Sequence, residues 1–381
     1  MRNINFFKHS LLKFNSIQNI KKVLTSNVIT TGKIGETVEK KISYFFNINY
    51  CLLTNSWTNG AIATLLALGI KKNDEVIIPA LTFVACANVI ELVGAKPIFI
   101  DIDKNSLLIN NDEIIKKISN KTKAIMVVHL YGNMFDVKNL KIYLDKKKLK
   151  IPIIEDCAHS FESKFKNEKV GKYSKVSIFS FYATKNISCG EGGAIITKDK
   201  ILYEKIKQTR SHGITKNFQK RFYEKKYSHW DMKILGTKAN LPDILSCLLP
   251  SQIDKVYINR KKRINAFKFY NKILSDLNLR MQFIDPQCAS SFHLYPIHVN
   301  PKIRNNVIRY LNKNGVSCTV NYQAITSLTY YRNKYKILPK DFPISSEWGE
   351  GTISLPFYPE ISKNDQIYVA NILKKALKKY V

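Results

Sequence analysis

The sequence predicts an α/β fold in which a large domain, built on a mainly parallel sheet, is followed by a smaller α/β domain. The chain has 381 residues, which exceeds one typical domain, and its 45% of hydrophobic residues is enough for a substantial core. From about residue 50 to residue 210, short apolar segments alternate with helical patterns. Alternating strands and helices imply a largely parallel sheet that is covered by helices.

The large domain is expected to contain seven strands. They are predicted at residues 50–54, 75–79, 97–101, 124–128, 151–155, 176–181 and 194–197. Helices are predicted over 58–68 and 84–93. The strands are apolar runs, rich in β-branched residues and without polar alternation, which indicates burial on both faces. The last two strands follow each other closely, so we expect them to form a hairpin.

After residue 245 the pattern changes. The predicted elements are a long polar helix over 251–277, strands around 292–299 and 316–320, and helices over 303–314 and 363–379. We therefore predict a large domain over residues 1–245 and a small C-terminal α/β domain over residues 246–381.

The chain is strongly basic. Its 61 Lys and Arg residues exceed its 29 Asp and Glu residues, which gives a formal net charge of +32. Such a charge raises nucleic-acid binding as a hypothesis. However, the lysines are spread along the whole chain, and we find no basic arm, zinc finger or aromatic RNA-binding strand. We therefore expect no nucleic-acid partner, although a basic surface would help to attract an anionic substrate.

The cysteines and the apolar segments indicate the cellular compartment in which the protein is expected. The seven cysteines are scattered and form no CxxC pair, so we expect no metal site, and most of them fit small buried residues in a reducing cytosol. The N-terminal residues lack the pattern of a signal peptide. The longest apolar run, 61–70, is too short to span a bilayer. We expect a soluble, cytoplasmic protein with no membrane partner.

Three polar clusters follow predicted strands, where ligands of open α/β sheets gather. Asp156 lies in the first cluster, 155–160, and taken alone it could be a solvated loop residue. Lys185 lies in the second, and most lysines in such a place are surface residues, but the glycine-rich turn 190–193 confines it near the end of the sheet. The third cluster, 55–60, precedes a helix and fits a simple cap or a phosphate site equally well.

Ten segments along the chain match motifs of one known family. They are 29–33, 74–79, 94–101, 128–132, 155–159, 180–186, 190–193, 210–213, 238–243 and 353–357. The chain resembles the DegT/DnrJ/EryC1/StrS aminotransferases, which make amino sugars from nucleotide-linked ketosugars. The order of Glu-Asp…His, Phe-Tyr…Thr-Lys-Asn and Gly-Glu-Gly-Gly is highly specific. The resemblance implies the cofactor pyridoxal 5′-phosphate, the aspartate-aminotransferase fold (fold type I) and a homodimer with shared active sites.

The resemblance also implies catalytic roles for three residues. Lys185 matches the lysine that binds the aldehyde of the cofactor, is displaced by the incoming amine and then shuttles a proton. Asp156 matches the acid that pairs with the pyridinium nitrogen and so keeps the ring an electron sink. His159 matches a residue that orients the phenolic oxygen of the cofactor by a hydrogen bond.

Five further cofactor contacts are implied in the same way. Phe83 matches an aromatic residue stacked on the cofactor ring, whereas a lone phenylalanine after a strand would otherwise be assigned to core packing. Ser180 and Thr58 match phosphate ligands, together with the backbone N–H of Trp57. Asn240 matches a phosphate donor from the partner subunit, which is why a dimer is expected.

Trp57 is a departure from the family, whose members usually carry a small residue there. A backbone N–H can still donate from tryptophan. The bulky ring must be accommodated, and we expect it along the wall of the pocket, where it would affect the local geometry and the fit of the substrate.

The expected reaction moves an amino group, from glutamate, to a nucleotide-diphosphate-linked ketosugar. The segment around Lys185 and His159 favours C4 of a 4-keto-6-deoxysugar. A C3 ketosugar aminotransferase and a cyclitol aminotransferase remain alternatives. A sugar dehydratase of the same fold is a further alternative, although such dehydratases carry histidine in place of the lysine. A non-catalytic or nucleic-acid-binding protein of this fold is disfavoured by the intact residue set.

Overall fold

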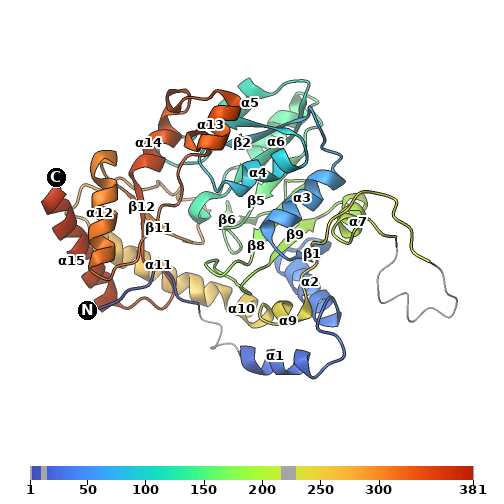
Figure 1. Cartoon of the computed structure of the whole chain (residues 1–381), viewed down its shortest axis with the longest axis horizontal. Coiled ribbons are helices and arrows are strands. Elements are labelled where there is room, and N and C mark those ends of the chain that lie inside the picture. The colour runs from blue at the N-terminus through green and yellow to red at the C-terminus, as the bar shows by residue number, and fades with distance from the viewer. Residues whose placement is uncertain (1, 10–14, 216–228, 381) are drawn as a thin grey trace.

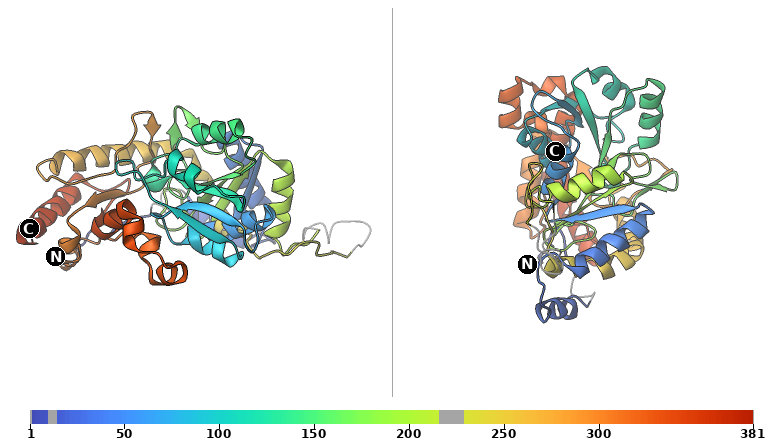
Figure 2. Two further views of the ribbon diagram at one scale, coloured as in Figure 1. Left: turned by 90° about the horizontal axis from the view of Figure 1, so that it is seen from above. Right: turned by 90° about the vertical axis from the view of Figure 1, so that its right-hand side faces the viewer.

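The computed structural model describes residues 2–9, 15–215 and 229–380. It shows a central seven-stranded sheet covered by helices, with a smaller α/β unit beside it (Figure 1). Both termini lie at the end of the molecule that this smaller unit forms, whereas α7 lies towards the other end (Figure 2).

The central sheet has the strand order β1-β9-β8-β5-β4-β2-β3. Its strands are β1 (Tyr50–Thr54), β2 (Glu75–Pro79), β3 (Lys96–Ile100), β4 (Thr122–Val128), β5 (Ile153–Asp156), β8 (Val176–Ser180) and β9 (Gly193–Thr197). β9 runs antiparallel to both of its neighbours, and the other pairs are parallel. The predicted mainly parallel sheet is confirmed, and so is the hairpin of β8 and β9.

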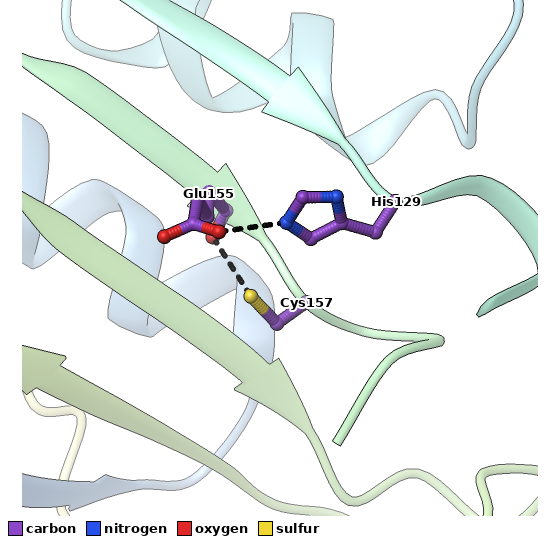
Figure 3. Close-up of side chains that lie close together, drawn as sticks. All are labelled: His129, Glu155 and Cys157. Atoms are coloured by element: carbon purple, nitrogen blue, oxygen red, sulfur yellow. Dashed lines mark hydrogen bonds and ion pairs between the residues drawn. The ribbon is translucent and has the colours of Figure 1, made fainter. Parts of the chain in front are cut away.

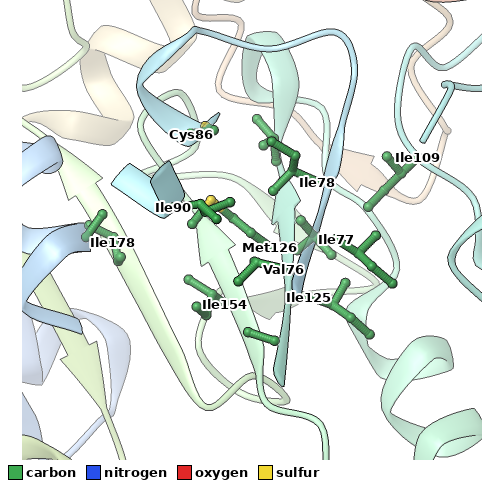
Figure 4. Close-up of a cluster of buried hydrophobic side chains, with 14 of the residues drawn as sticks. Val76, Ile77, Ile78, Cys86, Ile90, Ile109, Ile125, Met126, Ile154 and Ile178 are labelled. Atoms are coloured by element: carbon green, nitrogen blue, oxygen red, sulfur yellow. The ribbon is translucent and has the colours of Figure 1, made fainter. Parts of the chain in front are cut away.

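Apolar runs produce these strands because both faces of the sheet are covered. Val76, Ile77 and Ile78 are consecutive in β2, and none of them has exposed surface. Consecutive strand residues point to opposite faces, so β2 is buried on both sides. Figure 4 shows these residues in one cluster with Ile125 of the adjacent β4 and Ile154 of β5, the next strand of the sheet.

The helices of the large unit connect these strands. α3 (Trp57–Ala67) and α4 (Ala85–Leu92) lie within one residue of the predicted ranges. The other helices are α1 (Ser16–Leu24), α2 (Lys33–Phe46), α5 (Asn111–Lys117), α6 (Val137–Lys146) and α7 (Lys200–Thr209). The sequence analysis did not predict α1 or α2, although α2 buries Val38, Ile42 and Phe46 at a helical spacing of four residues.

The smaller unit packs helices on a two-stranded antiparallel sheet. Its elements are α11 (Val256–Ile273), β11 (Tyr295–His298), α12 (Pro301–Lys313), β12 (Thr352–Leu355) and α15 (Lys363–Tyr380). Shorter elements join the two units: α9 (Asp243–Ser246), α10 (Pro250–Asp254), α13 (Thr329–Tyr335), α14 (Pro343–Gly351), and the small sheet of β6 (Lys164–Phe165), β7 (Glu168–Lys169) and β10 (Cys288–Ala289).

Two predictions for this region were wrong. The single helix expected over 251–277 is two helices, because α10 ends at Asp254 and α11 begins at Val256, and α11 ends at Ile273. The strand expected over 316–320 makes only isolated bridges, from Val316 to Ile4 and from Thr319 to Ser354. A strand needs a neighbour along its whole length, and this segment has none.

The N-terminal segment belongs to the core of the smaller unit. Ile4 is 3% exposed and packs in the same cluster as Tyr295 and Leu311. Its backbone exchanges hydrogen bonds with the residues around Val316, with Gly315 accepting at 2.7 Å and Ser317 donating at 2.9 Å. The segment around Ile4 therefore packs in the smaller unit, and the domain boundary between residues 245 and 246 stays a prediction.

Among the described residues, no helix is both long enough and apolar enough to cross a bilayer. All seven cysteines are unpaired thiols, and six of them are buried.

Candidate active site

A cavity of about 600 Å³ opens at the carboxyl ends of the central strands. Its wall comes from the loops after β1, β2, β4, β5 and β8, from the segment 319–322 of the smaller unit, and from Phe6. Seven of the eight residues that the sequence singled out line it: Trp57, Thr58, Phe83, Asp156, His159, Ser180 and Lys185. Asn240 does not.

The N-terminus of α3 offers unpaired donors to the cavity. Ser56 caps the helix, and its hydroxyl accepts from the N–H of Asn59 at 3.1 Å. The N–H groups of Trp57 and Thr58 make no hydrogen bond within the described residues. Ser180 faces the same cavity. Free N–H groups and a helix dipole are the features that bind anions at helix N-termini, so this geometry is compatible with the phosphate site expected at residues 55–60.

Gly193 allows this arrangement. It is the first residue of β9 and pairs with Thr54 and Ser180 on the two flanking strands. A Cβ atom at Gly193 would lie 2.7 Å from the carbonyl oxygen of Phe179 and 2.9 Å from the carbonyl carbon of Ser56. Both atoms are backbone, so only glycine lets the start of α3 approach the sheet this closely.

The Trp57 ring is largely buried, with 6% of its surface exposed. It belongs to the main hydrophobic cluster, together with Leu65 and Ile195, and also forms part of the cavity wall. Its indole N–H is buried and has no hydrogen-bond partner among the described residues. The bulky side chain is therefore accommodated by the core while its backbone N–H remains at the anion site.

Asp156 ends β5 at the base of the cavity and is 5% exposed. Its Oδ1 accepts from the N–H of Ala158 at 2.9 Å, and its Oδ2 accepts from the thiol of Cys86 at 3.2 Å. Burial raises the pKa of Asp156, while these two donors and the charge of Lys185 oppose the shift. A buried carboxylate of this kind is stabilised by a cationic group in the cavity. Sequence analysis missed Cys86, since nothing in the local pattern distinguishes it from a core cysteine.

Lys185 is half-buried, and its side chain faces the cavity rather than the surface. Its Nζ makes no hydrogen bond or ion pair within the described residues. Burial lowers the pKa of Lys185 to about 8, although the charge of Asp156 acts in the opposite direction. A lowered pKa increases the fraction of neutral amine, which is the nucleophilic form.

His159 is fixed by two hydrogen bonds. Its Nδ1 accepts from the N–H of Tyr131 at 3.2 Å, so the proton of the neutral ring lies on Nε2, which is 3.1 Å from the hydroxyl of Tyr322. Burial, and then the charges of Lys185 and His293, hold the pKa of His159 well below its usual value. The ring is therefore a neutral hydrogen-bond donor at the cavity wall.

Phe83 is 53% exposed although it is a large apolar residue. Its ring lines the cavity and lies 5.5 Å from that of Tyr322. Core packing therefore does not explain this residue, whereas a stacking surface for a planar ligand does.

A buried cluster of His129, Glu155 and Cys157 lies beside Asp156 (Figure 3). His129 Nε2 donates to Glu155 at 2.8 Å, while its Nδ1 accepts from the N–H of Phe135. The other oxygen of Glu155 accepts from Gly171 and Ser177. Burial raises the pKa of Cys157, which keeps it a thiol. Since both ring nitrogens of His129 and the carboxylate of Glu155 already make hydrogen bonds, we assign no metal to this group. These hydrogen bonds stabilise the end of β5.

Asn240 lies in a second cavity, of about 650 Å³, that is lined by residues of α2 and α7. Its side chain donates to Ser211 at 3.0 Å and accepts from Lys238 at 3.1 Å. The structure contains one chain, so the expected reach of Asn240 into the site of a partner stays a prediction.

Comparisons with known proteins agree with this geometry. The sequence profile of the DegT/DnrJ/EryC1/StrS aminotransferase family matches residues 11–374. MJ1066 of Methanocaldococcus jannaschii is 36% identical over 366 residues, which are 94% of each chain. The PLP form of Spr1654 from Streptococcus pneumoniae, described as a sugar aminotransferase, superposes with a TM-score of 0.91 at 26% identity over the whole of both chains. Helicobacter pylori PseC, an aminotransferase, does so with a TM-score of 0.88 at 27% identity, also over both whole chains.

The fold and the cavity define a pyridoxal-phosphate-dependent aminotransferase. The chain belongs to the DegT/DnrJ/EryC1/StrS aminotransferase family.

The residues of the cavity fit this cofactor. A phosphate matches the free N–H groups of Trp57 and Thr58, a planar ring matches the exposed face of Phe83, and a protonated ring nitrogen matches the buried carboxylate of Asp156. The unpaired amine of Lys185 matches the aldehyde. The chain thus supplies one partner for each functional group of pyridoxal phosphate.

Proposed function

We propose that this enzyme transfers an amino group from glutamate to C4 of a nucleotide-diphosphate-linked 4-keto-6-deoxysugar. The observation that carries the assignment to aminotransfer is the unpaired amine of Lys185, which faces the same cavity as the buried carboxylate of Asp156. Two relatives support a sugar substrate: Spr1654 is described as a sugar aminotransferase, and PseC takes part in the biosynthesis of pseudoaminic acid. The net charge of +32 suits an anionic nucleotide sugar.

Each residue has a defined task in this proposal. When bound, the cofactor supplies an electron sink that stabilises negative charge on the carbon next to the transferred nitrogen. Lys185 would hold the cofactor through its aldehyde until an incoming amine displaces it. The freed Nζ would then be the group that takes the proton from the carbon bearing the transferred nitrogen and returns it to the former aldehyde carbon. Asp156 would hold a proton on the ring nitrogen, and His159, whose Nε2 lies 3.1 Å from the hydroxyl of Tyr322, would orient the phenolic oxygen.

The remaining predicted residues hold the cofactor in place. Ser180, Thr58 and the backbone N–H of Trp57 bind the phosphate, and Phe83 covers the ring. Aminotransfer at C3 of a ketosugar, or to a cyclitol, uses the same residues and remains the second candidate. Dehydration of a sugar is disfavoured because Lys185 is present where the dehydratases carry histidine.

We also propose a homodimer in which Asn240 completes the phosphate site of the partner. Two observations support a second copy at this surface. Asn240 opens into a large cavity away from its own active site, and the nearby Val28 and Ile29 are 38% and 58% exposed although they are apolar. A cytoplasmic location, like the dimer, stays a prediction.

The test begins with the purified protein. We expect an absorbance band of the lysine-bound cofactor near the visible edge, which glutamate should convert to the amine form. Lys185→Ala should lose both the band and turnover, whereas Lys200→Ala, an exposed lysine of α7, should keep them. Normal transamination by Lys185→Ala would overturn the mechanism.

The substrate is then identified with dTDP-, UDP- and GDP-linked 4-keto-6-deoxysugars. Turnover of one of them, with the new amine at C4 shown by NMR, supports the proposal. Failure of all three together with turnover of a 3-keto isomer would overturn the C4 assignment.

A further inference from the structure

Beside Lys185 the protein buries a chain of four polar side chains from both parts of the molecule. Arg263 of α11 and Glu162 form an ion pair, and each is 2% exposed. Asn186 donates its Nδ2 to Glu162 Oε1 at 3.0 Å. His293, which is 5% exposed, lies 3.0 Å through Nδ1 from the Oδ1 of Asn186. The proposed mechanism uses none of these four residues, and the sequence analysis noted only Asn186, as the last residue of the family motif 180–186.

The direction of every hydrogen bond in this chain follows from its charged end. Arg263 can only donate and the Glu162 carboxylate can only accept. Asn186 must therefore turn its amide N–H to Glu162 and its oxygen to His293. That oxygen can only accept, so the proton of His293 lies on Nδ1 and its Nε2 carries the lone pair.

His293 packs directly on His159. The ring centroids are 4.2 Å apart and the planes differ by 26°. The edge of His159 is already held by the N–H of Tyr131 and the hydroxyl of Tyr322. His293 covers one of its faces, so the ring of His159 is restrained in both orientation and tilt.

The charged groups around His159 favour its neutral form. The titratable groups packed against it are Lys185, His293, Tyr131 and Tyr322. Burial raises the pKa of both tyrosines, which therefore stay uncharged. Lys185 and His293 both disfavour a positive charge on His159, and burial also lowers the pKa of His293. If either His159 or His293 were protonated, its positive charge would lie against the other imidazole ring and close to the positive charge of Lys185.

We propose that His293 is a positioning residue for His159: held in its Nδ1-protonated form by Asn186, Glu162 and Arg263, it keeps the His159 ring neutral and its Nε2–H aimed at the cavity. The inference rests on the proposed role of His159. A partner that fixes the tautomer and plane of a functional histidine acts through that histidine, and its loss is expected to cost about tenfold to a hundredfold in activity.

Two variants separate the contributions of His293. His293→Phe keeps a flat ring against His159 and loses the bond to Asn186, whereas His293→Gln keeps an N–H donor and loses the ring. His298→Phe is the matched control, since His298 is also buried and stacked on an aromatic ring, Trp348, but does not contact His159.

The deciding measurement is NMR of the holoenzyme labelled in histidine, with the His159 signal identified by its loss in His159→Gln. In the natural protein we expect this signal not to titrate between about pH 5 and pH 8. In His293→Gln water reaches the ring, so we expect titration with a midpoint near the usual value of about 6.5. The acid limb of the kcat profile should move upward with it, and kcat should fall while the KM for glutamate changes little. His293→Phe should show a smaller shift.

The outcomes are distinguishable. An unchanged His159 signal and an unchanged kcat profile in both His293 variants, with a slow His159→Gln enzyme, would overturn only this inference. A fall in activity that His298→Phe reproduces, without any titration of His159, would show that His293 has a merely structural role and would also overturn it. A His159→Gln enzyme with normal turnover would instead remove the proposed role of His159.

Discussion

The thiol of Cys86 donates a hydrogen bond to the carboxylate of Asp156 over 3.2 Å, from the first turn of α4 to the end of β5. Asp156 is buried, and this thiol and the N–H of Ala158 are the two donors that satisfy its oxygens. A carboxylate that pairs with the cofactor must remain ionised, and each donor helps it to do so.

Replacing Cys86 should therefore weaken cofactor binding. Cys86→Val removes the donor without changing the volume greatly, so the pKa of Asp156 should rise further and the affinity should fall by about 1 kcal/mol, which is about fivefold in Kd. Cys86→Ser keeps a donor and should bind normally. Titration of the apoenzyme with pyridoxal phosphate measures the difference, with Cys288→Val as a control for loss of a buried thiol. Equal affinity in Cys86→Val and the natural protein would contradict the prediction.

The pKa of Lys185 predicts how capture of the cofactor depends on pH. Burial lowers this pKa to about 8, so the neutral amine becomes the main form as the pH rises through that value. The rate at which the apoenzyme captures pyridoxal phosphate covalently should rise with pH and level off above a midpoint near 8. A lysine with an ordinary pKa would give a rate that still increases at pH 10. Lys185→Arg should show no capture at any pH.

Gly193 should be intolerant of any side chain. A Cβ atom would lie within 2.9 Å of two backbone atoms, which cannot move aside as a side chain could. We expect Gly193→Ala to lower the free energy of unfolding by roughly 3 kcal/mol and to weaken phosphate binding. Gly69→Ala is the control: Gly69 has a φ of 78° and open space around it, so it should cost only about 1 kcal/mol of backbone strain. Equal effects of the two substitutions on Tm would argue against the close packing of β9 and α3.

The buried pair of Arg263 and Glu162 predicts a pH-dependent loss of stability. Burial raises the pKa of Glu162, and Arg263 opposes that shift. In Arg263→Met the carboxylate loses its cation, and its Oε2 already lacks a partner among the described residues, so unfolding should become easier by about 3–5 kcal/mol. A raised pKa makes the folded state bind a proton more tightly, so the loss should be largest at high pH and shrink as the pH falls through the pKa of Glu162.

The matched control for this prediction is the double variant Glu162→Gln with Arg263→Met, which removes both charges. It should regain most of the stability and lose the pH dependence, as followed by thermal unfolding. A Tm difference between Arg263→Met and the natural protein that is the same at all pH values would contradict the assignment to Glu162.

The proposed sharing of active sites between subunits predicts complementation between two variants with different defects. Asn240→Ala should weaken the phosphate site of the partner, and Lys185→Ala disables its own site. In a mixed dimer one site carries both defects and the other carries neither, so mixing the two variants should restore up to about a quarter of the natural activity if exchange is random. Recovery should follow the time course of subunit exchange. No recovery, in a mixture shown by mass spectrometry to contain mixed dimers, would place Asn240 outside the partner's site.

Local sequence was enough for the strands and for the residues next to them. The predicted bounds of β1 and β2 agree with the structure at both ends, because their apolar runs without polar alternation are typical of strands buried on both faces. Asp156 ends β5, and Lys185 lies in the connection between β8 and β9, so the convergence of strand ends in an α/β sheet places them near one another. Their motifs also carried the family resemblance, which comparison of the whole chain then established.

The rest depended on contacts between distant segments. The sequence showed the helical region 251–277 but not its break after Asp254, and it suggested a strand at 316–320 that makes only isolated bridges, to Ile4 and to Ser354. Cys86 and His293 carry no local signal, because a buried thiol and a buried histidine look like ordinary core residues until their partners are known.

The sequence by itself therefore determined the class of fold and the polar clusters beside the strand ends, since these follow from short-range patterns of apolar and polar side chains, and its motifs carried the family resemblance that implies the cofactor. Only the tertiary structure decided the protonation and orientation of the site. Asp156 meets Cys86 across 70 positions, and His159 meets His293, whose tautomer is fixed through Asn186 and Glu162 by Arg263. Burial and hydrogen-bond direction set these properties, and both depend on which distant residues the fold brings into contact.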